Sequence, residues 1–64
     1  MSDHTERMKT EHAELSIKLI SLETFIHGNA KFKSLCSLEQ ARMIKQSAFM
    51  RAYADVLESR IWVS

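Results

Sequence analysis

The chain has 64 residues, a formal net charge of +1, one glycine, no proline and one cysteine. This length allows one domain that buries only about 60% of the surface that its unfolded chain exposes. The small net charge argues against a protein that binds mainly polyanions, and the lone cysteine excludes an intrachain disulfide. The sequence has no run of about 20 apolar residues that would span a membrane, and the polar N-terminus over residues 1–4 has no apolar signal core, which predicts a cytosolic protein.

A first helix is predicted over about residues 4–27. It carries a largely apolar stripe whose members recur at alternating spacings of four and three residues. These members are Met8, His12, Leu15, Leu19, Leu22 and Ile26. At about 100° per residue they share one narrow face, which is typical of a seam between helices packed side by side. Gly28 and Asn29 follow, and both tolerate the left-handed conformation of a helix C-cap, so the helix is expected to end there.

A short turn over residues 28–36 is predicted to close a hairpin. Phe32 and Leu35 form an apolar pair, and lysines at positions 31 and 33 flank the phenylalanine. We expect a single helical turn here that plugs the closed end of the hairpin.

The second helix is predicted over about residues 38–61. Ser37 as N-cap, with Gln40 three residues later, is the sequence pattern of a capping box. The seam residues expected on this helix are Met43, Met50, Tyr53, Leu57 and Ile61. The similar lengths of the two helices and the short link favour an antiparallel hairpin. The sequence therefore predicts an all-α fold, with one antiparallel two-helix hairpin domain spanning residues 1–64.

The chain has more apolar residues than one seam per helix requires. A further apolar set lies outside the two seams and consists of Ile17, Ile20, Phe25, Ile44, Ala48, Ala52 and Val56. Left in water, this set would form a patch larger than soluble monomers expose. We therefore predict that the hairpin assembles into a helical-bundle homo-oligomer, although the same residues could dock a foreign protein instead.

Catalysis is not expected of this chain. The sequence has no glycine-rich phosphate loop and no Cys–His pair on one helix face, and two helices offer little concavity for an active site. No metal is expected, because none of the three histidines is followed by a second ligand at metal-site spacing. No cofactor is implied.

The residues best suited to hold a ligand lie beside the seam of the second helix. They are Arg42, Gln46, Phe49, Tyr53 and Arg60. Aromatic faces stack on bases, and guanidinium groups bind phosphates and carboxylates. Repeated around an oligomer, this stripe could bind anionic nucleotides. The simpler interpretation makes the aromatics core or interface residues, the glutamine a satisfied polar group and the arginines solvated.

Charge is unevenly distributed along the chain. Residues 31–51 carry five basic side chains and one acidic side chain, a formal net of +4, whereas the first thirty residues carry five acidic and three basic ones. A basic hairpin tip could contact nucleic acid, but no recognition motif is present, and a solvated basic face is the simpler account. Near the open end, an ion pair between Glu11 and Arg60 is expected to fix the helix register.

One further pattern extends over nearly the whole chain. It consists of Arg7, Met8, Glu11, Leu15, Leu19, Leu22, Phe25, Ile26, Phe32, Leu35, Glu39, Gln40, Met43, Gln46, Met50, Tyr53, Leu57, Arg60 and Ile61. This pattern resembles a family of very small phage and prophage helical-hairpin proteins that is named after a crAss-like phage member and is largely uncharacterised. Much of it is hydrophobic spacing that any helical hairpin shares. The less generic matches are Phe25-Ile26, Gln46, Tyr53 and Arg60-Ile61.

The resemblance implies a phage accessory protein that acts by stoichiometric binding in the cytoplasm of the infected bacterial host. Small phage proteins of this size often counter host defences, some by inhibiting a defence protein and some by sequestering a cyclic or other anionic nucleotide signal. The alternatives are a nucleic-acid-associated accessory protein that uses the basic tip, and a structural assembly or scaffolding protein. The expected partners are a second copy of the chain and either a host defence protein or such a nucleotide, with no membrane.

Overall fold

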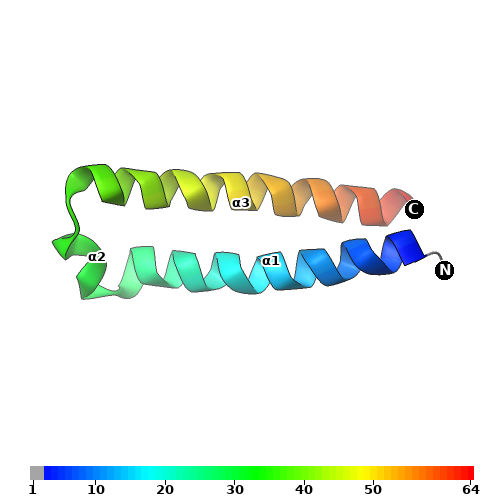
Figure 1. The fold of residues 1–64 in the computed structure, drawn as a ribbon, viewed down its shortest axis with the longest axis horizontal. Coiled ribbons are helices and arrows are strands. Elements are labelled where there is room, and N and C mark those ends of the chain that lie inside the picture. Colours follow the sequence, from blue (N-terminus) through cyan, green and yellow to red (C-terminus); the bar gives the residue numbers. More distant parts are fainter. Residues whose placement is uncertain (1–2) are drawn as a thin grey trace.

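Residues 3–64 are described by a computed structural model, and within that range the chain forms two long helices joined by a short one (Figure 1). Helix α1 spans Asp3–Gly28, α2 spans Ala30–Ser34 and α3 spans Ser37–Val63. Met1 and Ser2, which belong to the polar N-terminus considered above, lie outside the described residues. Helices α1 and α3 run antiparallel along a rod of 47 × 15 × 13 Å. The predicted all-α hairpin is therefore confirmed.

The core is a single seam between α1 and α3. Its most deeply buried side chains are Met8, Leu19, Ala54 and Leu57, and Leu57 has no exposed surface. The prediction that Tyr53 belongs to this seam is wrong, because the side chain is 44% exposed. Counting back from Leu57 by three and four residues gives Ala54, Met50, Ser47 and Met43, and all four are buried or half-buried. Tyr53 is rotated by about 100° from Ala54 and lies at the edge of the seam.

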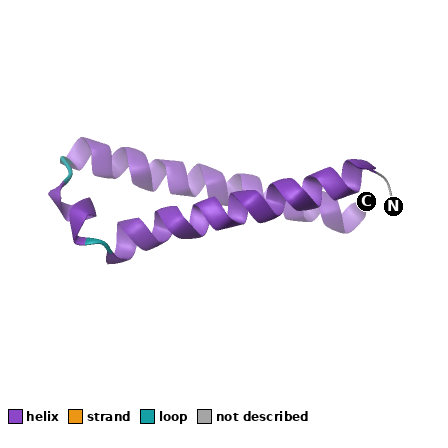
Figure 2. Ribbon diagram, turned by 60° about the horizontal axis from the view of Figure 1, so that its bottom comes forward, coloured by secondary structure: helices purple, strands orange, loops and turns teal. Residues whose placement is uncertain are grey.

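The closed end of the hairpin is filled by α2. Helices α1 and α3 diverge toward this end, and α2 bridges them (Figures 1 and 2). Phe32 of α2 is buried, and its ring lies edge-on to that of Phe25, with 6.1 Å between the ring centroids and an interplanar angle of 88°. The expected apolar plug is present, and this edge-to-face contact is a favourable aromatic geometry.

The left-handed cap expected after α1 does not form. Gly28 belongs to α1, and no residue in the described range has a positive φ. Asn29 instead adopts an extended conformation, with φ of −104°, and its Oδ1 accepts a hydrogen bond of 2.8 Å from the backbone N–H of Lys31. Asn29 is therefore the N-cap of α2. Because α2 begins immediately after this residue, the chain turns without a left-handed residue.

The predicted capping box at the start of α3 is also wrong. Cys36 occupies the N-cap position without a side-chain hydrogen bond, and Ser37 is already helical. The Nε2 amide of Gln40 reaches back to the preceding turn, where it donates to the carbonyl oxygens of Leu35 at 2.8 Å and Lys33 at 3.3 Å. Gln40 thus ties α3 to the C-terminal end of α2 rather than to its own N-cap.

Candidate ligand-binding surface on α3

One face of α3 carries a shallow, open depression beside the seam. It is lined by Arg42, Lys45, Gln46, Phe49, Met50 and Tyr53. The spacing of three and four residues brings these side chains together along one side of the helix. Four of the five predicted ligand residues, all except Arg60, therefore lie in one place. We call these six lining residues the α3 depression.

The α3 depression combines an apolar surface with a basic border. Phe49 is 67% exposed although it is a large aromatic residue. Gln46 donates from Nε2 to the Sδ atom of Met50 at 3.8 Å, which places the amide beside the apolar surface. Arg42 and Lys45 are both exposed. An exposed ring next to two cations can stack on a planar group and hold an anion attached to it.

Tyr53 is held at one end of the depression by a contact between the two long helices. Its hydroxyl donates a hydrogen bond to Oε2 of Glu11 on α1. This hydrogen bond, followed by partial burial and the negative charge of Glu11, raises the pKa of the Tyr53 phenol, and the nearby positive charge of Arg60 partly opposes that rise. The tyrosine is therefore a neutral, oriented side chain at neutral pH.

The contact between Glu11 and Tyr53 replaces the ion pair that the sequence predicted for Glu11. No ion pair joins Glu11 to Arg60 among the residues that the structure describes. Arg60 lies seven residues beyond Tyr53, about 10 Å further along the helix, and does not line the depression. Residue pattern alone offered no signal for the Glu11–Tyr53 contact, because it depends on how α1 and α3 are aligned.

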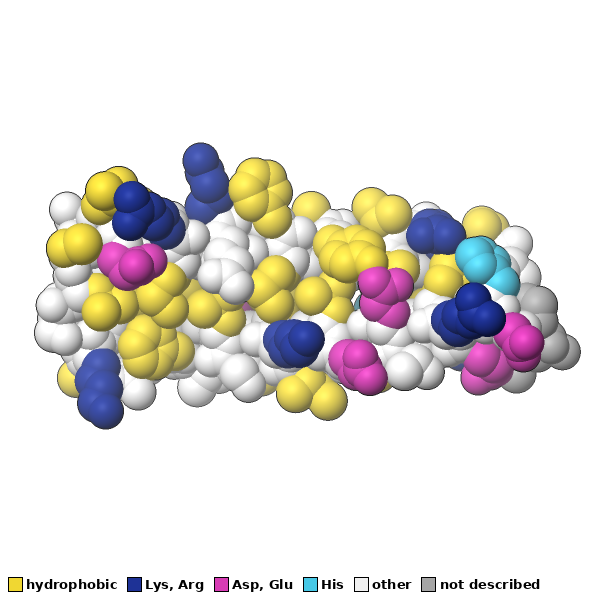
Figure 3. All heavy atoms as spheres, in the orientation of Figure 1, with side chains coloured by type: hydrophobic (Ala, Val, Ile, Leu, Met, Phe, Trp, Pro, Cys, Tyr) yellow, Lys and Arg dark blue, Asp and Glu magenta, His cyan; other side chains and the backbone are white. Residues whose placement is uncertain are grey.

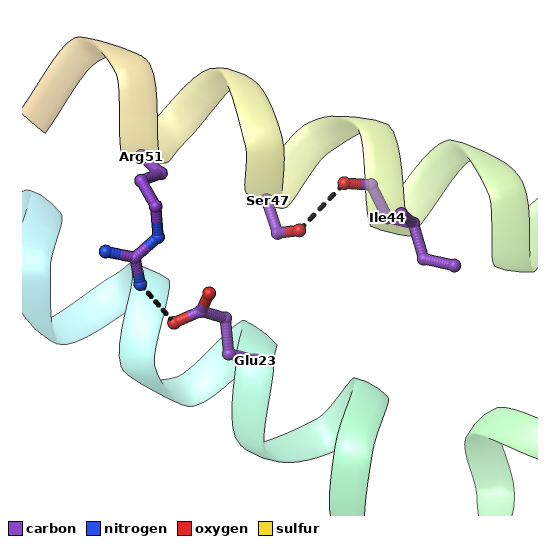
Figure 4. A network of polar contacts seen from close by, with 4 residues as sticks. All are labelled: Glu23, Ile44, Ser47 and Arg51. Atoms are coloured by element: carbon purple, nitrogen blue, oxygen red, sulfur yellow. Dashed lines mark hydrogen bonds and ion pairs between the residues drawn. The ribbon is translucent and has the colours of Figure 1, made fainter.

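The interhelical ion pair forms elsewhere, on the other side of the seam. Nη2 of Arg51 lies 2.7 Å from Oε1 of Glu23, and this contact raises the pKa of Arg51 (Figure 4). One turn earlier, the hydroxyl of Ser47 donates to the backbone oxygen of Ile44 at 2.7 Å. This bond satisfies a polar side chain that faces the seam. Polar contacts thus tie both edges of the hairpin together.

Most of the predicted partner-face residues are open to solvent. Six of the seven are exposed, on both long helices: Ile17, Ile20, Ile44, Ala48, Ala52 and Val56. Phe25 differs, because it is half-buried and packs against Phe32 at the closed end. The structure therefore uses Phe25 to close the hairpin.

Two further features concern metals and membranes. Within residues 3–64, no three His, Cys, Asp or Glu side chains come together in a way that could hold a metal ion. Across the same residues, neither long helix has an apolar stretch sufficient for a transmembrane span.

Comparison with known proteins places this geometry in a family. The chain is 34% identical over 61 residues to a protein of Enterobacteria phage T4 described as an uncharacterized 7.5 kDa protein in the denB–rIIB intergenic region. The match covers 95% of this chain and 94% of the phage protein, so the resemblance to very small phage proteins is confirmed. No solved structure matches. The model of the Sequestin family matches residues 2–63, and the chain belongs to the Sequestin family.

Proposed function

We propose that this protein is a phage accessory factor that counters host defence by sequestering a partner, in the cytoplasm of the infected bacterium. It acts by stoichiometric binding, without catalysis and without a cofactor. The family name points to sequestration, and the relative from phage T4 supports a phage setting. The narrower relation to crAss-like phage proteins stays a prediction.

The partner that best fits the α3 depression is an anionic nucleotide, such as a cyclic nucleotide that carries an immune signal. The observation behind this choice is the exposed ring of Phe49 beside the cations Arg42 and Lys45. A base would stack on the ring, and its phosphates would meet the basic border. An open depression on a single hairpin gives little enclosure, which suits binding better than chemistry.

Calorimetric titration of the purified protein with a panel of cyclic and linear nucleotides tests this proposal. We expect at least one anionic nucleotide to bind, and Arg42→Ala and Phe49→Ala each to weaken that binding at least about tenfold. Lys18→Ala is the matched control, because it removes an exposed basic residue of α1 outside the depression. Equal loss in Lys18→Ala would show a general charge effect and contradict a site on α3.

A host defence protein is the other target within the same function. If no nucleotide in the panel binds, yet the protein still protects phage growth in a defence-carrying strain, the target is a protein. In that case Arg42→Ala and Phe49→Ala are scored for protection instead. Protection that both variants retain in full would remove the α3 depression from the function altogether.

The basic closed end keeps nucleic acid as a second candidate partner. Lys31 and Lys33 of α2 are exposed there, and the acidic residues are concentrated in the other half of the molecule. Binding through phosphates weakens steeply with salt. This candidate predicts that the protein binds a DNA or RNA duplex with an affinity that falls as the salt concentration rises. It also predicts that Lys31→Ala and Lys33→Ala each reduce that affinity. An assembly or scaffolding protein would bind none of these ligands.

A further inference from the structure

The face of α3 that points away from the seam is apolar and uncovered. It is formed by Leu38, Ala52, Val56 and Val63, with Lys45 as the one charged residue among them, all of them exposed, and we call it the outer face of α3. At about 100° per residue these positions lie opposite the seam. Hydrophobic side chains recur along the edge of the molecule over α3 (Figure 3). This helix therefore has two apolar faces, and the hairpin covers only one of them.

The exposed area of the chain is larger than that of a compact monomer of its mass. The surface measures 4958 Å², whereas a folded monomer of 7.4 kDa exposes about 4,200 Å². The excess of about 750 Å² is close to the 800 Å² or so that each partner contributes to a standard stable interface. Burying about 800 Å² against a second copy would bring the exposed area per chain down to about that of a compact monomer.

Charge along the rod favours one orientation of that copy. The closed half, residues 17–51, has six basic and two acidic side chains, a formal net of +4. The open half, residues 3–16 and 52–64, has three basic and six acidic side chains, a net of −3. On the face drawn in Figure 3 the acidic side chains gather mostly over the open half. Two parallel rods would place like charges together, whereas two antiparallel rods pair opposite charges.

We infer that the outer face of α3 docks against the same face of a second copy of this chain, with the two hairpins antiparallel. The contact is isologous, so it closes as a pair. The small side chain of Ala52 lies near the middle of α3 and allows close approach of the two helices. The test does not depend on the proposed function, because the four apolar residues of the outer face lie outside the α3 depression and only Lys45 belongs to both.

Native mass spectrometry with one charged substitution tests the interface. We expect the wild-type chain to form an assembly with an even number of copies, and Val56→Asp to raise its dissociation constant at least about tenfold, because a carboxylate would be buried without a partner. Ser21→Asp is the matched control, since it adds the same charge at an exposed position of α1. Circular dichroism verifies that both variants remain helical. A monomeric wild type, or equal effects of the two variants, would overturn the interface.

The single cysteine tests the orientation. Cys36 is free and exposed at the closed end, so a spin label on it reports the distance between the closed ends of two copies. Antiparallel copies separate the labels by a distance approaching the 47 Å length of the rod. Parallel copies would bring them within about 20 Å, because packed helix axes lie about 8–10 Å apart. A pulsed dipolar measurement that gives the short distance would overturn the antiparallel arrangement.

Discussion

Replacing Leu57 with alanine is expected to cost a large part of the stability of this protein. Leu57 has 0% of its surface exposed, in the contact between α1 and the C-terminal part of α3. Alanine removes three carbon atoms, each worth about 0.8 kcal/mol of burial, and leaves a cavity that adds to the loss. The expected total is about 3–4 kcal/mol. A chain of 64 residues has only about 3–10 kcal/mol of net stability, so Leu57→Ala should remove at least about a third of it.

Urea unfolding followed by far-ultraviolet circular dichroism measures this loss. Ile17→Ala is the matched control, because Ile17 is also a branched aliphatic residue of a long helix but is 67% exposed. Substitutions at such positions change stability by no more than about 0.5 kcal/mol. All samples must be compared at one protein concentration, since self-association adds to apparent stability. A loss below about 1 kcal/mol for Leu57→Ala, or equal losses in both variants, would refute the assignment of the core to this seam.

Three further contacts give predictions of their own. The pKa of Tyr53 is raised in the folded state, so the tyrosine adds stability below its unfolded pKa, and this contribution is lost as the pH rises through the folded pKa. Phenolate absorbance of this single tyrosine should show a lower pKa in Glu11→Gln than in the wild type. Identical titrations of the two proteins would contradict the contact. The exposed Arg51–Glu23 pair should stabilise the hairpin slightly at low salt and hardly at high salt, so an Arg51→Ala loss that is independent of salt would point to packing instead. Asn29→Ala should cost about 1 kcal/mol in thermal or urea unfolding, whereas Asn29→Asp, which keeps the capping oxygen, should be nearly neutral.

The candidate surface could be predicted in part, because most of it belongs to one helix. Arg42, Gln46, Phe49 and Tyr53 follow helical spacing, so their shared side of α3 is a property of the sequence once the helix is recognised. Lys45 also lines the depression, but it was expected only as part of the basic tip. It lies four residues before Phe49, so helical spacing places it on the same side of α3, and the interpretation of its charge as part of the tip is what kept it out of the predicted set.

The caps were predicted less well than the helices. Gly28 and Ser37 have the residue types of a C-cap and an N-cap, but both lie within helices. The reason is α2, whose start uses the side chain of Asn29 and whose end is tied to α3 by Gln40. Residue types at helix ends permit several capping arrangements, and the geometry of the closed end selects one of them.

The sequence by itself determined the helices and the seam of α1, because helical periodicity is a local property and large apolar residues mark every position of that seam except His12. Only the tertiary structure decided the seam of α3, where Ser47 and Ala54 carry too little hydrophobic signal to be distinguished from neighbouring positions. It likewise decided that Tyr53 meets Glu11, 42 residues away along the chain. Contacts of that kind depend on the alignment of two helices, which is fixed when their side chains interlock and not by either helix alone.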